Sequence, residues 1–105
     1  MLLSVGHIVH YVLHKRDVDF IRKQRRVPYH RDAPVAIGGN AVSEGEHVSM
    51  IVTKIWMEKN ANLFPCINGQ CILDGVDQHW VTSVPFGENK DTGTWHWVER
   101  ETNAY

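Results

Sequence analysis

The chain has few of the residues and runs that mark easily recognised classes of protein. Two cysteines in 105 residues are too few for a disulfide framework, which agrees with a reducing compartment. No eighteen apolar residues follow one another, and the apolar run at the N-terminus is too short for a signal peptide. With 11 basic and 12 acidic side chains, the chain lacks the positive field that binding of a long nucleic acid needs. We therefore expect a soluble, intracellular protein that contacts neither a membrane nor a long nucleic acid.

Motifs of catalysis are also scarce. Ser83, His79 and Asp77 can be arranged on paper as a nucleophile, a base and an orienting carboxylate. No nucleophile elbow surrounds Ser83, and the chain has no glycine-rich phosphate loop. We predict that the protein is not an enzyme and that it has no catalytic residue.

Two pairs of potential metal ligands can be found in the sequence. His10 and His14 are spaced i, i+4, and Cys66 and Cys71 flank the dipeptide Asn-Gly. Neither pair has CxxC spacing, whereas a structural zinc ion needs four ligands. We predict no metal and no cofactor, and we interpret the two cysteines as small core residues.

The longest run of β-branched and apolar residues, residues 47–56, predicts a central strand. Its middle, Met50 to Val52, is apolar throughout, so we expect both of its faces to be covered. Asn68-Gly69 between two apolar runs predicts a tight hairpin turn. Further strands are expected over residues 6–14, 63–73, 80–84 and 94–98. These short strands predict one all-β domain over residues 1–105, an SH3-like antiparallel barrel, with an OB-like barrel as the alternative.

About thirty residues after the first strand show no strand periodicity. The segment, residues 15–46, is long for a compact domain and predicts a functional or interfacial insertion that is irregular or partly helical. Asp17 can cap a short helix in it, and the cations near residues 22–26 suit the far end of a helix dipole. Such an insertion is suited to wrapping a second copy, so we expect a homo-oligomer.

Several short motifs occur in an order that resembles a known family. They are Val9-His10-Tyr11-Val12-Leu13, Ile51-Val52-Thr53-Lys54-Ile55-Trp56, Asn62-Leu63, Asp74-Gly75, Thr82-Ser83-Val84-Pro85 and Gly93-Thr94-Trp95-His96-Trp97. In this order and spacing they resemble a family of small uncharacterised tailed-phage and prophage proteins. The resemblance omits residues 15–46, where this chain carries a longer insertion. It implies a phage accessory protein in the cytoplasm of a bacterial host, and it supplies no catalytic residues.

Cations and flat rings suggest a binding site. A guanidinium matches the oxygen pairs of a phosphate and a ring stacks on a base, so together they suit a phosphate-bearing nucleotide. The alternative interpretation is a solvated helix end together with core tryptophans. The predicted ligand-binding residues are Arg22, Arg25, Arg26, Tyr29, His30, Arg31, Trp56, Trp95 and Trp97. Among them, Arg25 and Arg26 are expected to face solvent.

These observations lead to one functional hypothesis and two alternatives. The first is a non-catalytic phage-type protein that binds and sequesters a small anionic, nucleotide-like molecule that serves as a host defence signal. The second is a protein–protein adaptor of a virion or host-takeover complex, in which aromatic residues anchor the partner. The third is binding of single-stranded nucleic acid across the barrel. A near-neutral chain favours a small ligand over a polymer, because few cations suffice for two phosphates.

Overall fold

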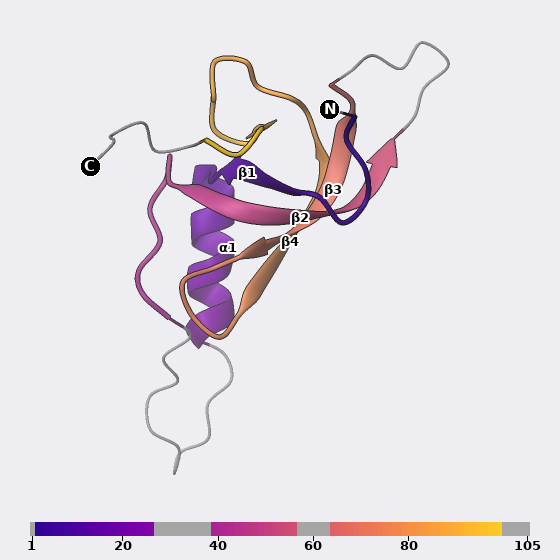
Figure 1. The fold of residues 1–105 in the computed structure, drawn as a ribbon. Helices are drawn as coiled ribbons and strands as arrows, with labels where there is room; N and C mark the ends of the chain where they lie inside the picture. The colour runs from indigo at the N-terminus through magenta and orange to yellow at the C-terminus, as the bar shows by residue number, and fades with distance from the viewer. Residues whose placement is uncertain (1, 27–38, 57–63, 100–105) are drawn as a thin grey trace, which may run out of the picture.

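A computed structural model describes residues 2–26, 39–56 and 64–99 of the chain. The strands form one antiparallel sheet with the order β4-β3-β2-β1-β5 (Figure 1). The predicted all-β class is thus confirmed, with one helix among the described residues. The elements in chain order are β1 (Ile8–Val12), α1 (Lys15–Arg26), β2 (His47–Trp56), β3 (Cys66–Ile72), β4 (Gln78–Val84) and β5 (Trp95–His96).

The sheet is open, so the predicted SH3-like barrel is not confirmed. Strands β4 and β5 are the two edges of the strand order. The segment after β4 approaches β5 through an isolated bridge between Phe86 and Trp95 and a hydrogen bond from Trp95 N to Pro85 O. Because β5 has two residues, it offers few backbone groups with which to join the edges.

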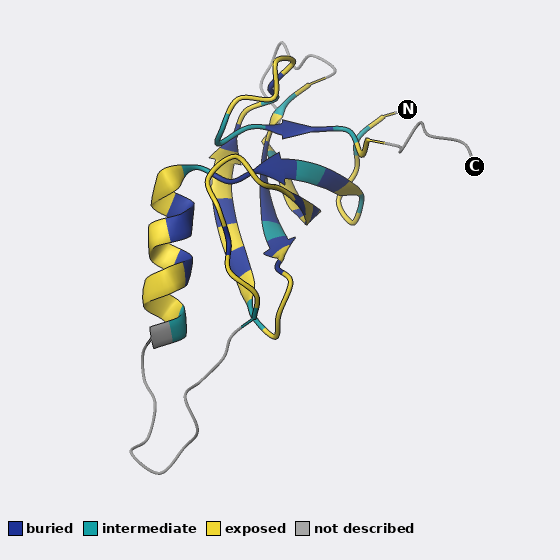
Figure 2. Cartoon of the chain, turned by 90° about the vertical axis from the view of Figure 1, so that its left-hand side faces the viewer, coloured by how far each residue is buried: buried dark blue, intermediate teal, exposed yellow. Residues whose placement is uncertain are grey.

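Helix α1 lies within the predicted insertion and confirms that the insertion is partly helical. Val18 and Ile21 are buried, and the buried stripe of the helix faces the sheet while the opposite side is exposed (Figure 2). A helix with one apolar stripe packs that stripe against the core, so α1 covers one face of the sheet. Residues 27–38 of the insertion lie outside the described residues. In the described ranges, no helix is long and apolar enough to cross a membrane.

The central strand β2 is covered on one face rather than on two. Val48, Met50 and Val52 are buried, whereas Ile51 between them is 37% exposed. The prediction that both faces of this strand are covered was wrong, because α1 packs on the inner face and the outer face of β2 stays open around Ile51. Burial therefore alternates along the apolar middle of β2, as it does in a strand with one covered face.

The dipeptide Asn68-Gly69 does not form the predicted hairpin turn. Both residues lie inside β3, and the register of β3 shifts here against both β2 and β4. Asn68 is buried, and its Oδ1 accepts hydrogen bonds from Trp56 Nε1 at 2.9 Å, Thr82 Oγ1 at 2.9 Å and Ser83 N at 2.8 Å. The Asn-Gly motif thus marks an irregularity in a continuous strand, fixed by one side-chain carbonyl.

Gly69 allows close contact between β3 and β2. A Cβ atom at this position would lie 2.4 Å from Met50 Cγ and 2.9 Å from Ile51 O, and Met50 is fully buried. We expect Gly69→Ala to lower the free energy of unfolding by about 1–3 kcal/mol, the usual effect of overpacking. Urea denaturation followed by circular dichroism measures it. Gln70→Ala, one position further along, is the control, and equal stability of the two variants would contradict the packing role.

Candidate functional site

A buried hydrogen-bond network connects the first turn of α1 to the sheet. Asp17 Oδ2 accepts hydrogen bonds from Tyr11 Oη at 2.5 Å and from His14 N at 2.9 Å. Asp17 Oδ1 lies 2.9 Å from His79 Nε2, which donates because an ionised carboxylate only accepts. By bonding the backbone N–H of His14, Asp17 satisfies one free donor at the start of the helix. One carboxylate thereby fixes the helix start, strand β1 and strand β4.

The network sets the charges of its members. Burial acts to raise the pKa of Asp17, but the hydrogen bonds from His79 and Tyr11 outweigh it and hold that pKa below its usual value. Burial, reinforced by the Asp17 charge, raises the pKa of the Tyr11 hydroxyl well above its usual range. Burial and the same charge raise the pKa of the Cys71 thiol to about 12. At neutral pH Asp17 is therefore ionised, whereas the Tyr11 hydroxyl and the Cys71 thiol keep their protons.

A pocket of about 540 Å³, called here the ligand pocket, opens beside this network. It lies between the N-terminal half of α1 and the edge strand β4, and the loop after β4 contributes Pro85 and Gly93. Its volume is in the range of small-molecule sites. Besides Tyr11, Asp17 and His79, the lining includes Arg16, Phe20, Trp80, Thr82 and Ser83.

Two side chains of the ligand pocket, those of Arg16 and Phe20, are available to a ligand. The Arg16 guanidinium has no hydrogen-bond or ion-pair partner among the described residues, and Arg16 is exposed. Phe20 is 57% exposed and Trp80 is 55% exposed. By contrast, the Thr82 hydroxyl already donates to Asn68 Oδ1. The Trp80 side chain lies on the other face of β4, because Trp80 pairs with Gln70 and Gln70 pairs with Ile51. Within the described residues, the pocket thus combines one cation without a partner with one accessible ring, that of Phe20.

The basic residues predicted to bind a ligand do not line this pocket. The prediction that Arg25 faces solvent was wrong. Its Nε and Nη2 donate to Asp77 at 2.9 and 3.1 Å, and its side chain is 13% exposed. The physical reason is that the last turn of α1 packs beside the turn before β4, where Asp77 lies and where Asn40 O accepts a further bond from Arg25 at 2.7 Å. Arg25 therefore has a structural role. Arg22 is exposed on α1 and donates to Val42 O at 3.5 Å.

The other basic and aromatic residues of the predicted insertion site cannot be placed. Arg26 is the last residue of α1, and its side chain is outside the described part of the structure. Tyr29, His30 and Arg31 lie in residues 27–38, which are likewise outside the described residues.

The three predicted ligand-binding tryptophans do not converge. Trp95 is fully buried in the core and its Nε1 donates to Pro65 O at 3.0 Å, which corrects its assignment to a ligand site. Trp97 is half-buried and packs edge-on against Trp95. Trp56 is exposed at the end of β2, with Lys54 Nζ 4.4 Å above its ring. The ring available at the ligand pocket is that of Phe20, which sequence reasoning did not select.

A second group of polar residues, called here the histidine cluster, consists of His10, His47, His96 and Glu99. Glu99 Oε1 accepts hydrogen bonds from His47 Nδ1 at 2.7 Å and His96 Nε2 at 2.6 Å, and Oε2 accepts one from Lys90 Nζ at 3.1 Å. Lys90 first, then His96 and His47, lower the pKa of Glu99 to about 2. Burial lowers the pKa of His96 and outweighs the opposing effect of Glu99.

The sequence contained only weak signals for either site. His79 pairs with Asp17, and Asp77 pairs with Arg25, so the arrangement of Ser83, His79 and Asp77 considered on paper does not occur. His14, the suggested partner of His10, lies beyond β1, and its Nδ1 accepts a hydrogen bond from the backbone N of Arg16 at 3.1 Å. The i, i+3 spacing of His96 and Glu99 is the one local signal in the cluster. Of the two cysteines, Cys71 is buried as predicted, but Cys66 is exposed.

Comparison of the chain with family models, with curated proteins and with solved structures finds no match. The resemblance to phage proteins therefore stays a prediction.

Proposed function

We propose that the protein is a non-catalytic binding protein that captures a small nucleotide-like anion in the ligand pocket. The observation that carries the proposal is the presence in the lining of one pocket of an exposed ring, Phe20, and of Arg16, whose guanidinium has no hydrogen-bond or ion-pair partner among the described residues. Guanidinium N–H groups form paired hydrogen bonds to phosphate oxygens, and aromatic faces stack on bases. The pocket thus offers a nucleotide one contact for each of its two parts.

The charge of the site favours a small ligand over a polymer. Arg16 is the one cation in the lining of the pocket, and the formal net charge of the chain is −1. A single guanidinium can satisfy a terminal phosphate group, whereas a polymer gains affinity by neutralising many phosphates at once.

The arrangement around Ser83 supports binding without catalysis. A serine nucleophile needs a hydrogen bond to its base, which in turn is held by a carboxylate. Asp17 holds His79, but His79 Nδ1 has no hydrogen-bond partner in the part of the chain that the structure describes, so no bond connects it to Ser83. The pocket therefore lacks the activated hydroxyl of a hydrolase.

A binding protein of this kind acts by lowering the free concentration of its ligand. This action fits the phage-type accessory role that the sequence resemblance implies, in which the sequestered molecule is a defence signal of the bacterial host. The extent to which such a protein lowers the free ligand concentration depends only on its affinity for the ligand and on its abundance.

The expected result of a ligand screen is thermal stabilisation by one class of small nucleotide. The panel contains mononucleotides, cyclic mono- and dinucleotides and short oligonucleotides. A ligand at a hundred times its dissociation constant adds about 2.7 kcal/mol of apparent stability, which raises the melting temperature by several degrees. Arg16→Ala is expected to weaken binding at least roughly tenfold, because it removes a charge-assisted hydrogen bond.

Lys23→Ala is the matched control for Arg16→Ala. Lys23 is exposed on the same helix and does not line the pocket, so its removal changes the charge equally without touching the site. Equal loss of affinity in both variants would refute the assignment of Arg16. A steep fall of affinity with added salt would instead indicate single-stranded nucleic acid as the ligand.

One observation favours the adaptor as the second candidate. Ile8, Ile51 and Ile72 are 54%, 37% and 40% exposed, and Ile8 and Ile51 are direct partners in the β1–β2 ladder. They lie on the face of the sheet that α1 leaves open. An apolar surface of this kind suits a protein partner or a second copy, as in the expected homo-oligomer. Failure of every nucleotide to stabilise the protein at high concentration would place this candidate first.

A further inference from the structure

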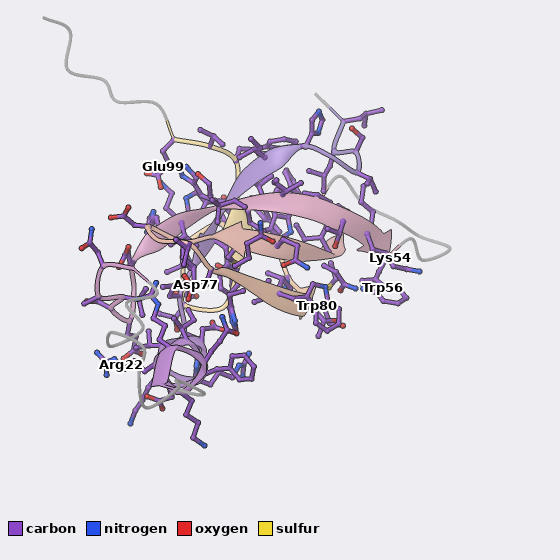
Figure 3. All side chains as sticks on the ribbon, turned by 90° about the horizontal axis from the view of Figure 1, so that it is seen from below. Arg22, Lys54, Trp56, Asp77, Trp80 and Glu99 are labelled. Carbon is purple, nitrogen blue, oxygen red and sulfur yellow. The ribbon has the colours of Figure 1, made fainter. Side chains whose placement is uncertain are left out.

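The histidine cluster is assembled by strand pairing on the face of the sheet away from α1. His10 of β1 is the direct partner of His96 in β5, and Val12, two residues after His10, is the partner of His47 in β2. Residues two apart on a strand share a face, so the three imidazoles lie on one face. Figure 3 shows Glu99 on the side of the sheet opposite to that of α1, from which Arg22 projects.

The four side chains converge on a small volume. One ligand atom from each of the four lies within 4.8 Å of the others. The ring centroids of His47 and His96 are 4.9 Å apart, and those of His10 and His96 are 5.6 Å apart. A single oxygen, Glu99 Oε1, contacts two of the imidazoles. The third imidazole, His10, accepts a hydrogen bond from the backbone N of Glu99 through Nδ1 at 3.5 Å.

We infer that His10, His47, His96 and Glu99 bind a divalent transition metal ion of the zinc class. Imidazole nitrogen and carboxylate oxygen are ligands of zinc, and four of them complete a tetrahedral shell. Zinc–ligand bonds of about 2.0–2.2 Å place tetrahedral ligand atoms roughly 3.3–3.6 Å apart. The ligand atoms of the cluster are separated by distances on both sides of that value, from 2.6 Å up to 4.8 Å. Side-chain rotations that move these atoms by about an ångström therefore suffice to form the shell.

The surroundings of the cluster favour the metal over a purely hydrogen-bonded group. His96 is 4% exposed, and its second ring nitrogen, Nδ1, has no hydrogen-bond partner among the described residues. Lys90 contacts Glu99 through Oε2, so the ion would bind at Oε1 and replace the two hydrogen bonds that Oε1 accepts from His47 and His96. The backbones of three paired strands, β1, β2 and β5, fix three of the ligands, so binding requires little ordering of the chain.

The ion has a structural consequence that is independent of the ligand pocket. Strand β5 pairs with β1 through two residue pairs, His10 with His96 and Tyr11 with Trp95. Ligands from β1, β2 and the segment after β5 would hold this short strand and Glu99 on the sheet. With all four positions filled by protein, the ion has no open position for a substrate, which marks a structural rather than a catalytic centre.

The test is a titration of the full chain, prepared without a histidine tag and stripped of metal with EDTA. Calorimetry with Zn²⁺ near neutral pH is expected to give a single site with a dissociation constant below about 1 µM, as for other sites with four protein ligands. Co²⁺ in place of Zn²⁺ reports tetrahedral coordination by its visible absorption. Zn²⁺ should also raise the melting temperature of the stripped protein.

Two variants and one control locate the site. His10→Gln and Glu99→Gln each remove a ligand, and both side chains reach the surface, so the metal-free fold should persist in circular dichroism. Each is expected to weaken Zn²⁺ binding by about 100-fold or more. His14→Gln, a histidine outside the cluster, should bind as the unaltered chain does. A dissociation constant above 1 µM for the unaltered chain, or unchanged affinity in both ligand variants, overturns the proposal.

Discussion

Asp17→Ala is expected to lower the free energy of unfolding by about 3–5 kcal/mol, the usual effect of removing one partner from a buried polar group. The carboxylate accepts hydrogen bonds from Tyr11, His14 and His79. Its removal leaves a phenol, a backbone N–H and an imidazole N–H without an acceptor, and each unpaired buried donor costs about 1–3 kcal/mol. It also removes the contact by which the start of α1 is held against β4.

Urea denaturation followed by circular dichroism at neutral pH measures this effect. Asp19→Ala is the matched control, because Asp19 is exposed on the same helix and should change stability by less than about 0.5 kcal/mol. Asp17→Asn should fall between the two, since its amide keeps one acceptor but presents N–H groups to the remaining donors. A loss below about 1 kcal/mol for Asp17→Ala would show that the network contributes little.

The second large effect is a loss of stability at alkaline pH. Folding raises the pKa of Cys71 to about 12 and raises that of Tyr11 above its usual range, in both cases mainly by burial. The unfolded chain therefore loses these protons first, near pH 8.5 for a thiol and near pH 10 for a phenol. The contribution of both groups is complete below those values and is lost as the pH rises. The loss is about 1.4 kcal/mol per pH unit for each group, roughly 5 kcal/mol by pH 11.

Urea denaturation between pH 7 and pH 11 measures this slope. Cys71→Ala should be less stable than the unaltered chain at pH 7, because it leaves a small cavity, but it should lose less stability with rising pH. Cys66→Ala changes an exposed thiol and should keep the original slope. An identical slope in Cys71→Ala would show that this thiol does not govern the alkaline limb.

The strands and the helix were largely predictable because their signals are local. A run of β-branched and apolar residues identified β2, although it predicted cover on both faces. Asp17 indicated a helix as its possible cap, and the helix begins two residues earlier, with Asp17 in its first turn. Asn68-Gly69 misled because a turn-forming dipeptide can also serve a bulge, and the decision between them depends on Met50 and on three donors from other strands.

Neither candidate site was predictable, because each depends on pairing between distant segments. Arginine is a residue type that commonly binds anions, but the guanidinium of Arg25 is held by Asp77, fifty-two positions away. His10 and His96 become neighbours only through the β1–β5 register. Arg16 lines the pocket, whereas Arg22 and Arg25 bond to Val42 and Asp77, and the sequence does not reveal this difference.

Strand β1 contributes to both faces of the sheet with consecutive residues. His10 faces the histidine cluster, and Tyr11 faces the network beside the ligand pocket. A shift of this strand by one residue would turn the phenol toward the cluster and the imidazole toward the core. An insertion or deletion of one residue in β1 would therefore disable two unrelated sites at once. In evolution or in design, the residues of each site that lie outside β1 can change independently of the other site. Within β1, substitutions can alter one site at a time, whereas insertions and deletions alter both.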